Sequence, residues 1–198
     1  MGLRMDYMPG QTPLDEDEKE GLLIETIAIR RELDEFEQLN IQEAVEWSLI
    51  SKFDASRVFT EKFILEVHKR MFGHVWEWAG RFRKSNKNIG VDKYIIGVSL
   101  GQLLGDVKYW YDNQVYKPDE LAIRFTHRLV KIHPFSNGNG RHSRLMADIT
   151  VSHLYDLKVF SWGGADLSGP GDIRREYLDS IYEADKGNYR PLLQFSRK

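Results

Sequence analysis

The sequence predicts a mostly α-helical domain, a bundle of helices with one β-hairpin inserted between them. Three observations lead to this fold class. Apolar residues recur every three or four positions over most of the chain, which is the spacing of one helix face. Residues that favour helix starts and helix ends stand at the borders of these stretches. Only residues 81–97 lack this spacing, and they carry β-branched and aromatic residues around glycine-containing turns, which indicates a hairpin or an extended flap.

The first elements expected are a polar N-terminal tail and a helix. Residues 1–20 are acidic and contain Pro and Gly, which is typical of a tail or a strap on the surface. One helical face is then formed by Ile29, Leu33 and Phe36. Asn40, with Glu43 three residues later, forms a capping-box pattern that predicts the start of another helix.

The next helices follow from their end signals. Thr60 is a good N-cap and Gly73 a good helix end, so they predict a helix between them. After the hairpin, Ser99 and Gln102 form a second capping-box pattern. Pro118 suits the first turn of the helix that follows. The apolar stripe of that helix consists of Leu121, Phe125, Leu129 and Ile132.

The last part of the chain predicts two further long helices. The helix that begins at Pro118 is expected to end at His133, because Pro134 disfavours a helical conformation in the residue before it. Another helix is expected over about residues 140–156. The sequence PGD at 170–172 predicts the start of the last long helix, and Gly187 its end.

The bulk properties indicate one soluble domain with a small appendage. We expect residues 1–39 to form an N-terminal tail and helix with a regulatory role, and residues 40–198 to form the main domain. The net charge of −2 disfavours nucleic acid as a partner. No stretch approaches the ~20 apolar residues of a membrane span, so no membrane partner is expected. The chain has no cysteine and no segment resembling a signal peptide, which favours a cytoplasmic location.

The segment HPFSNGNGRHSR, residues 133–144, is the candidate for chemistry. Its glycines, Gly138 and Gly140, stand where a helix is expected to begin, and a helix N-terminus with free N–H groups binds anions. Arg141 and Arg144 follow three residues apart, so both guanidinium groups lie on one helix face and suit phosphate oxygens. The spacing of a Walker A loop is missing. This pattern predicts a polyphosphate site.

His133 stands directly before that site. A neutral imidazole beside a bound phosphate can take the proton of an attacking hydroxyl. The residues therefore predict transfer of a phosphorus-containing group to a hydroxyl. The alternative is a glycine-rich turn before a helix, with a histidine that is only structural.

This segment resembles the signature of the Fic family (the Fic/Doc superfamily), HPFx(D/E)GNGRxxR. Every position matches except Asn137, where the family usually has an acid. The stretches MFGHVWEWAGRFR and YLDSIYEADKGNYRPLLQF are also similar to the family, so the resemblance covers roughly residues 40–196. TPLDEDEKEGLL and the HPFxNGNGRH variant resemble the subgroup called mobile mystery protein B.

The resemblance implies a Fic-type helical bundle and a protein adenylyltransferase. AMP would pass from ATP, with Mg²⁺ or Mn²⁺ as the metal, to a Ser, Thr or Tyr hydroxyl of a target protein. By position, the general base would be His133. The nucleotide-binding residues would be Phe135, Gly138, Asn139, Gly140, Arg141 and Arg144. The flap residues that clamp the target would be Lys93, Tyr94, Ile95 and Ile96.

Two positions concern metal binding and regulation. The family's acid holds Mg²⁺, and Asn137 keeps an oxygen but not the charge. The metal is then expected to bind mainly through phosphates and water, with low activity or a need for Mn²⁺. The family's inhibitory pattern (S/T)xxxE(G/N) is approached by residues 16–21, so Glu20 is expected to restrain Arg144, or else to be part of an acidic surface strap.

Further partners and alternative functions stay open from the sequence. The resemblance allows a separate inhibitor or antitoxin protein, a homodimer and a toxin-like role. One alternative function is transfer of another phosphate-containing group, as in Doc-type relatives, although these lack the intact GNG triplet. The other is a Fic fold that binds nucleotide or a partner without turnover, which Asn137 favours and the intact His133 disfavours.

Overall fold

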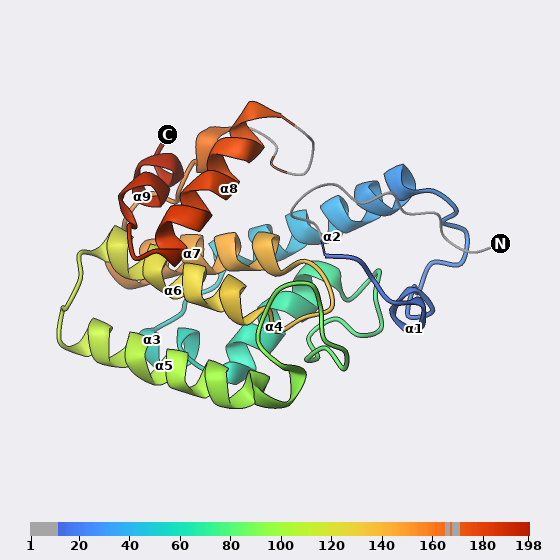
Figure 1. The fold of residues 1–198 in the computed structure, drawn as a ribbon, viewed down its shortest axis with the longest axis horizontal. Helices are drawn as coiled ribbons and strands as arrows, with labels where there is room; N and C mark the ends of the chain where they lie inside the picture. Colours follow the sequence, from blue (N-terminus) through green and yellow to red (C-terminus); the bar gives the residue numbers. More distant parts are fainter. Residues whose placement is uncertain (1–11, 165–166, 168–170) are drawn as a thin grey trace.

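Two long helices, α6 (Pro118–Ile132) and α7 (Asn139–Tyr155), lie against each other in the middle of the molecule (Figure 1). The loop that joins them, residues 133–138, is the first part of the candidate segment 133–144, and the rest of that segment is the start of α7. We call residues 133–138 the candidate loop. The structure is a computed structural model that describes residues 12–164, 167 and 171–198. Because α6 and α7 are packed together, the start and the end of this loop are fixed by the core of the protein.

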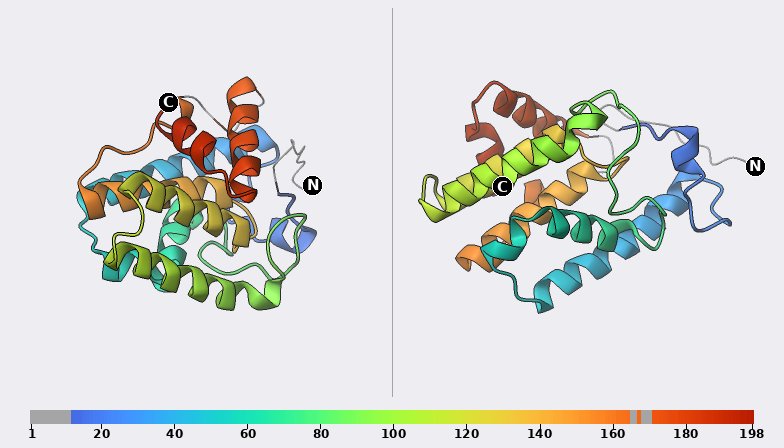
Figure 2. Two further views of the ribbon diagram at one scale, coloured as in Figure 1. Left: turned by 60° about the vertical axis from the view of Figure 1, so that its left-hand side comes forward. Right: turned by 90° about the horizontal axis from the view of Figure 1, so that it is seen from below.

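The other long helices surround this pair. The helix α2 (Arg30–Ile50) packs on α4 (Glu61–Phe72), and α5 (Ile96–Asp112) packs on α6. The helices α8 (Asp172–Asp185) and α9 (Arg190–Ser196) pack on each other, on the opposite side of the α6–α7 pair from α5 (Figures 1 and 2). The short elements are α1 (Glu16–Lys19), α3 (Ala55–Val58), η1 (Lys93–Ile95) and η2 (Trp162–Gly164).

The helices with clear end signals are confirmed. The Thr60 side chain accepts a hydrogen bond from Phe63 N at 3.2 Å, and Gly73 is the C-cap of α4. Pro118 occupies the first turn of α6. The whole predicted stripe of α6 is buried, at 0, 0, 1 and 7% exposure for Leu121, Phe125, Leu129 and Ile132. The predicted start of α7 at about residue 140 agrees with its observed start at Asn139.

The predicted helix start at Asn40 is wrong. The helix α2 continues through this position, and Asn40 is buried inside it. Its amide instead binds the end of α4, where Nδ2 donates to Arg70 O at 2.8 Å and Oδ1 accepts from His74 N at 2.9 Å. The side chain thus caps a neighbouring helix, which the local pattern could not reveal. The predicted apolar face also fails in part, because Ile29 and Phe36 are 46% and 42% exposed and only Leu33 is buried.

The predicted β-hairpin over residues 81–97 is not confirmed. These residues form a loop, the 3₁₀ turn η1 and the start of α5, and no strand lies in the described part of the chain. One isolated bridge joins Leu22 to Trp76 elsewhere. The helix α5 begins at Ile96, before the predicted cap at Ser99. The alternative of an extended flap describes residues 81–95, which we call the flap below.

No helix among the residues described here is both long enough and apolar enough to cross a lipid bilayer.

Candidate active site

His133 ends α6 in an unusual backbone conformation. It is the C-cap of the helix, with φ 56° and ψ 60°, in the left-handed region that few non-glycine residues adopt. The ring is buried, with 4% exposure. The carbonyl of His133 accepts a hydrogen bond from Arg83 Nε at 2.7 Å, and Arg83 N donates to Pro134 O at 2.9 Å. These bonds fix the backbone that carries the imidazole at the start of the loop.

The contacts of the His133 ring fix its tautomer. Nδ1 lies 3.2 Å from Val130 O, a carbonyl that can only accept, so Nδ1 carries the proton. Nε2 is then an acceptor, and it lies 2.8 Å from the hydroxyl of Thr12. Burial lowers the pKa of His133 from 6.5 to about 4, and the nearby charges of Arg83 and Lys87 also lower it. The ring is therefore neutral at pH 7, with Nε2 ready to accept a proton.

The start of α7 offers backbone donors beside this base. Its first hydrogen bond runs from His142 N to Gly138 O at 2.9 Å, so the N–H groups of residues 139–141 have no acceptor inside the helix. Gly138 N donates to Asn137 Oδ1 at 2.6 Å. The helix dipole adds partial positive charge at this end. The predicted anion-binding geometry is thus present at the expected residues.

Gly138 is required by two features of the loop. Its φ is +76°, in the left-handed region. A Cβ at this position would lie 2.5 Å from ring atoms of Phe72, closer than real side chains come. Gly140 differs, since a Cβ there would meet only Arg144 Nη1 at 3.8 Å. The first glycine therefore shapes the loop, while the second leaves space between the backbone and a guanidinium group.

The side chains of Phe135 and Asn139 support the loop from inside. Asn139 is 3% exposed; its Oδ1 accepts from Phe135 N at 3.0 Å and its Nδ2 donates to Phe135 O at 2.8 Å. Phe135 is fully buried and stacks on the His68 ring at 3.6 Å. His68 accepts from Gly80 N at Nδ1 and donates from Nε2 to Asn137 O at 3.0 Å. For a nucleotide, these two residues can offer only backbone and support, not their side chains.

Arg141 is paired with an acid that the sequence reasoning missed. Its Nη1 lies 2.6 Å from Glu37 Oε2, and its guanidinium lies over the Phe72 ring at 4.8 Å. The Glu37 carboxylate is nearly buried and accepts from Trp76 Nε1 at 2.7 Å through its other oxygen. The signal was available in α2, because Glu37 stands on the helix face whose buried members are Leu33, Glu37, Asn40, Ala44 and Ser48.

Arg144 lies one turn further along α7 and forms no ion pair within the described residues. Its guanidinium lies over the Tyr177 ring at 5.5 Å. The neighbouring Asp148 is half-buried, and this burial raises its pKa to about 7, although it accepts hydrogen bonds from Phe160 N and Trp162 Nε1. A half-buried guanidinium without a carboxylate partner can bind an incoming anion.

Arg83 joins the flap to the candidate loop. Besides the His133 carbonyl, its guanidinium donates to Ser85 O at 2.7 Å and to Val91 O. Gly90 approaches so closely that a Cβ there would lie 2.6 Å from His133 Cβ. These contacts use the backbone groups that strands would pair with each other, which explains why the flap is not a hairpin. Arg83 was not among the residues that the sequence predicted for the site.

The four predicted docking residues of the flap are not equivalent. Tyr94 and Ile95 are 83% and 48% exposed, and Lys93 is bonded through Nζ to Lys84 O at 2.8 Å. Ile96 is 1% exposed and belongs to the core at the start of α5. Ile96 is therefore not accessible to a partner, which corrects the prediction for this residue.

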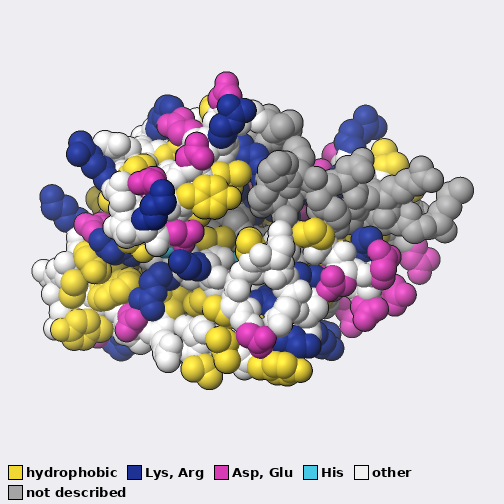
Figure 3. Space-filling view, in the orientation of Figure 1, with side chains coloured by type: hydrophobic (Ala, Val, Ile, Leu, Met, Phe, Trp, Pro, Cys, Tyr) yellow, Lys and Arg dark blue, Asp and Glu magenta, His cyan; other side chains and the backbone are white. Residues whose placement is uncertain are grey.

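The predicted pair between Glu20 and Arg144 is not formed among the described residues. Glu20 is an exposed C-cap residue of α1, outside the cleft that Arg144 lines. Acidic side chains gather on the surface over α1 (Figure 3). Their position agrees with the alternative of an acidic surface strap.

A cleft of about 670 Å³ brings the site together. Its wall includes the base, the glycine-rich loop and both arginines, here His133, Asn137, Gly138, Asn139, Gly140, Arg141 and Arg144. This volume is within the range of small-molecule sites, about 300–1,000 Å³. All the residues that the sequence predicted for the nucleotide therefore lie in or directly behind one cleft.

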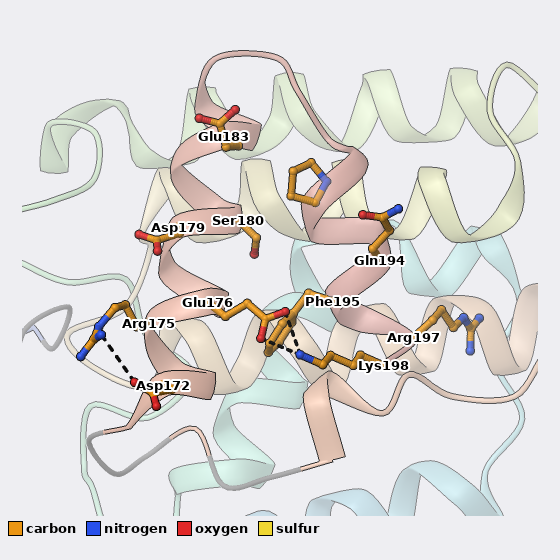
Figure 4. A pocket seen from close by; sticks show the side chains of 11 residues that line it. Asp172, Arg175, Glu176, Asp179, Ser180, Glu183, Gln194, Phe195, Arg197 and Lys198 are labelled. Atoms are coloured by element: carbon orange, nitrogen blue, oxygen red, sulfur yellow. Dashed lines mark hydrogen bonds and ion pairs between the residues drawn. The ribbon is translucent and has the colours of Figure 1, made fainter.

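A second hollow, about 720 Å³, lies between α8 and α9 (Figure 4). Most of its charged side chains form ion pairs, as in the contact of Glu176 with Lys198 at 2.8 Å and of Asp172 with Arg175 at 3.5 Å. It contains no part of the loop 133–144. We do not assign it to the site, because it lies apart from that segment and most of its charges are already paired.

The residues around the cleft offer little to a divalent metal by themselves. Within the described chain, no group of three or more His, Asp or Glu side chains could hold a metal ion. Asn137 offers one neutral oxygen, which is already bonded to Gly138 N. A magnesium ion would fit here only with substrate phosphates and water as most of its ligands.

Replacing Glu37 with Ala is expected to lower the free energy of unfolding by about 2–4 kcal/mol, because Trp76 Nε1 and Arg141 both lose their acceptor. Glu37→Gln keeps an oxygen for Trp76, so its loss should be smaller. Urea unfolding of the two variants measures the difference. Equal losses in both variants would contradict the role assigned to this carboxylate.

The fold and the site together define a class of protein, a helical domain with a phosphate-binding loop and a base beside it. Residues 58–150 match the family model described as Fic/DOC family. This part of the chain is a domain of the Fic/DOC family. The assignment to the mobile mystery protein B subgroup stays a prediction.

The sequence is similar to curated relatives over most of its length. It is 30% identical over 152 residues to "Protein adenylyltransferase Fic" of Aedes aegypti, covering 75% of this chain and 28% of the relative. It is 30% identical over 139 residues to "Protein adenylyltransferase fic-1" of Caenorhabditis elegans, covering 68% of this chain and 26% of the relative. The chain thus spans less than a third of the length of these two relatives.

The fold is also similar to solved structures. One is BepC of Bartonella tribocorum with bound AMPPNP, with a TM-score of 0.65 and 18% identity over 92% of this chain and 97% of that one. Another is Fic-1 of C. elegans, residues 134–508, with a TM-score of 0.65 and 24% identity over 90% of this chain and 51% of that one. At this identity the likeness establishes the fold.

Proposed function

We propose that the chain is a protein adenylyltransferase, which transfers AMP from ATP to a hydroxyl group of a target protein. The observation that carries the proposal is the neutral His133 ring, whose unprotonated Nε2 accepts a hydrogen bond from a hydroxyl beside the anion-binding start of α7. Names of the similar relatives support this activity. ATP as the donor is supported by the AMPPNP bound in a structure with the same fold.

In the proposed reaction each group has one task. The target hydroxyl attacks the α-phosphorus while His133 Nε2 takes its proton, and pyrophosphate leaves. The free N–H groups at the start of α7 stabilise the charge on the phosphate oxygens. Arg141 and Arg144 hold the β- and γ-phosphates and so keep the leaving group in line. Mg²⁺, bound by the phosphates with at most the Asn137 oxygen from the protein, would neutralise charge on the leaving pyrophosphate.

The partner proposed for this site is a protein with a Ser, Thr or Tyr hydroxyl. Tyr94 and Ile95 have exposed side chains, and they follow the flap residues Ile89 and Gly90 that line the cleft. A target segment lying along the flap would bring its hydroxyl towards His133, which the flap contacts through Arg83. An antitoxin partner or a homodimer finds no support in the described residues.

The test incubates the purified chain with ATP labelled on the α-phosphorus, Mg²⁺ and a cell lysate. We expect label on a protein band, and we expect its loss when His133 is replaced. Equal labelling by the His133 variant would contradict the proposal, because the reaction would then not need the His133 imidazole as its base.

Replacing Asn137 with Asp is expected to lower the Mg²⁺ concentration for half-maximal rate by roughly tenfold and to raise the rate, since carboxylates are the preferred ligands of this hard cation. Labelling rates are measured over a series of Mg²⁺ concentrations. Asn137→Ala serves as the control without any side-chain oxygen. An Asp variant with no gain at any Mg²⁺ concentration would contradict the expectation.

A further inference from the structure

The hydroxyl that faces the candidate base belongs to the chain itself. Thr12 Oγ1 lies 2.8 Å from His133 Nε2, although the two residues are 121 positions apart. Since Nδ1 of the ring donates to Val130 O, the Thr12 hydroxyl must be the donor in this bond. This is the contact that a general base makes with the nucleophile it activates.

The segment that carries Thr12 is held in place along its length. We call residues 12–20 the strap. Thr12 and Leu14 are 7% and 5% exposed, so alternate residues of the strap face the protein. The Thr12 carbonyl also accepts a hydrogen bond from Asn137 Nδ2 at 3.2 Å. Side chain and backbone of Thr12 are therefore both bound by the candidate loop.

The flap holds the other end of the strap. Lys87 Nζ lies 2.9 Å from Asp15 Oδ2 and also pairs with Glu18. Trp78 Nε1 donates to Glu18 O at 3.0 Å. The Lys87 side chain is 3% exposed, so this contact is shielded from solvent. The strap thus lies between the flap and the loop 133–144, where a target segment would have to lie.

Thr12 also lines the same cleft as the phosphate-binding groups. The cleft wall includes Thr12, His133, the glycines of the loop and both arginines. A triphosphate bound there would have its phosphates beside this hydroxyl. A purely structural hydrogen bond would need only the contact with the ring. Here the hydroxyl, the base and the anion-binding groups all face one space.

We infer that Thr12 is an acceptor of the chain's own reaction, and that the protein transfers AMP to Thr12 Oγ1 within one molecule. The inference rests on the proposed function and names a substrate for it. The Thr12 Oγ1–phosphorus bond forms, the bond between the α-phosphorus and the bridging oxygen breaks, and pyrophosphate leaves with that oxygen. The Thr12 proton passes to His133 Nε2.

The experiment follows the full chain with Mg-ATP by intact mass spectrometry and peptide mapping. We expect one added AMP, located on Thr12. Thr12→Val keeps the shape of the side chain without its hydroxyl and should lose the added mass, while Thr12→Ser should keep it. A lysate treated with the unaltered chain and α-³²P-ATP runs in parallel and reports AMP transfer to other proteins.

A mixing experiment tests whether the transfer is intramolecular. A Thr12→Val chain, which keeps the base, is mixed with a His133→Asn chain, which keeps Thr12. Transfer within one molecule predicts no AMP on the His133→Asn chain, and a self-labelling rate of the unaltered chain that does not depend on its concentration. AMP on Thr12 of the His133→Asn chain would overturn the intramolecular step.

Different results would overturn the assignment of Thr12 and the proposed function. Labelled lysate proteins with an unmodified Thr12, or AMP on another residue of the chain, would overturn the assignment of Thr12 and leave the proposed function standing. Absence of AMP from every protein, including the chain itself, would overturn both.

Discussion

His133→Asn is expected to lower the rate of AMP transfer by about 10²–10⁴-fold, the contribution typical of a positioned general base. The imidazole donates to Val130 O and presents an unprotonated Nε2 to a hydroxyl, and its pKa of about 4 keeps it neutral at pH 7. The amide of Asn cannot accept a proton at this pH. The chemistry should therefore be lost while the fold remains.

The choice of Asn separates chemistry from backbone strain. Residue 133 has φ 56°, a conformation that Asn tolerates and Ala does not. His133→Ala should therefore lose activity to the same extent but also unfold at a lower temperature than His133→Asn. Rates come from α-labelled ATP and stabilities from thermal unfolding. A His133→Asn rate within about tenfold of the unaltered chain would contradict the role of general base.

Gly138→Ala is the second change with a large expected effect. We expect the free energy of unfolding to fall by about 2–5 kcal/mol, the sum of left-handed strain and overpacking. The strain arises at φ +76°, and the overpacking arises because the methyl group would lie 2.5 Å from the Phe72 ring. Phe72 also carries the Arg141 guanidinium, so its displacement should weaken ATP binding as well.

Gly140→Ala is the matched control for stability. Its methyl group would meet Arg144 Nη1 only at an ordinary 3.8 Å, and Ala favours a helix more than Gly does. We expect unchanged or slightly higher stability in urea unfolding. Titration calorimetry with a non-hydrolysable ATP analogue then reports binding for both variants. A Gly138→Ala chain as stable as Gly140→Ala would contradict the loop geometry.

The helices of the core could be predicted because their signals are local. The Thr60 cap, the Pro118 start and the stripe from Leu121 to Ile132 need only neighbouring residues, and all three are confirmed. The helix start predicted at Asn40 is wrong because its amide caps a helix end 30 residues away in the sequence. The flap could not be predicted either, since its backbone groups are bound by the Arg83 side chain and not by a partner strand.

In the candidate site, too, local features could be predicted from the sequence and contacts between distant residues could not. The loop 133–144 could be predicted because its residues are contiguous in the sequence. The contacts of Glu37 with Arg141 and of Thr12 with His133 join residues that are 104 and 121 positions apart. No pattern within one segment contains such pairs. Only the packing of α2 and of the strap against α7 and the loop brings them together.

The most direct test of the proposed function is a paired reaction with ATP labelled on either the α- or the γ-phosphorus. The chain, a lysate and Mg²⁺ are common to both reactions, and the labelled proteins are compared on one gel. A His133→Asn chain runs beside the unaltered one, so that only label which depends on His133 is counted. AMP transfer predicts such label from α-³²P-ATP only, because the γ-phosphate leaves as pyrophosphate. His133-dependent protein label from γ-³²P-ATP, or none from either donor, would contradict the proposed function.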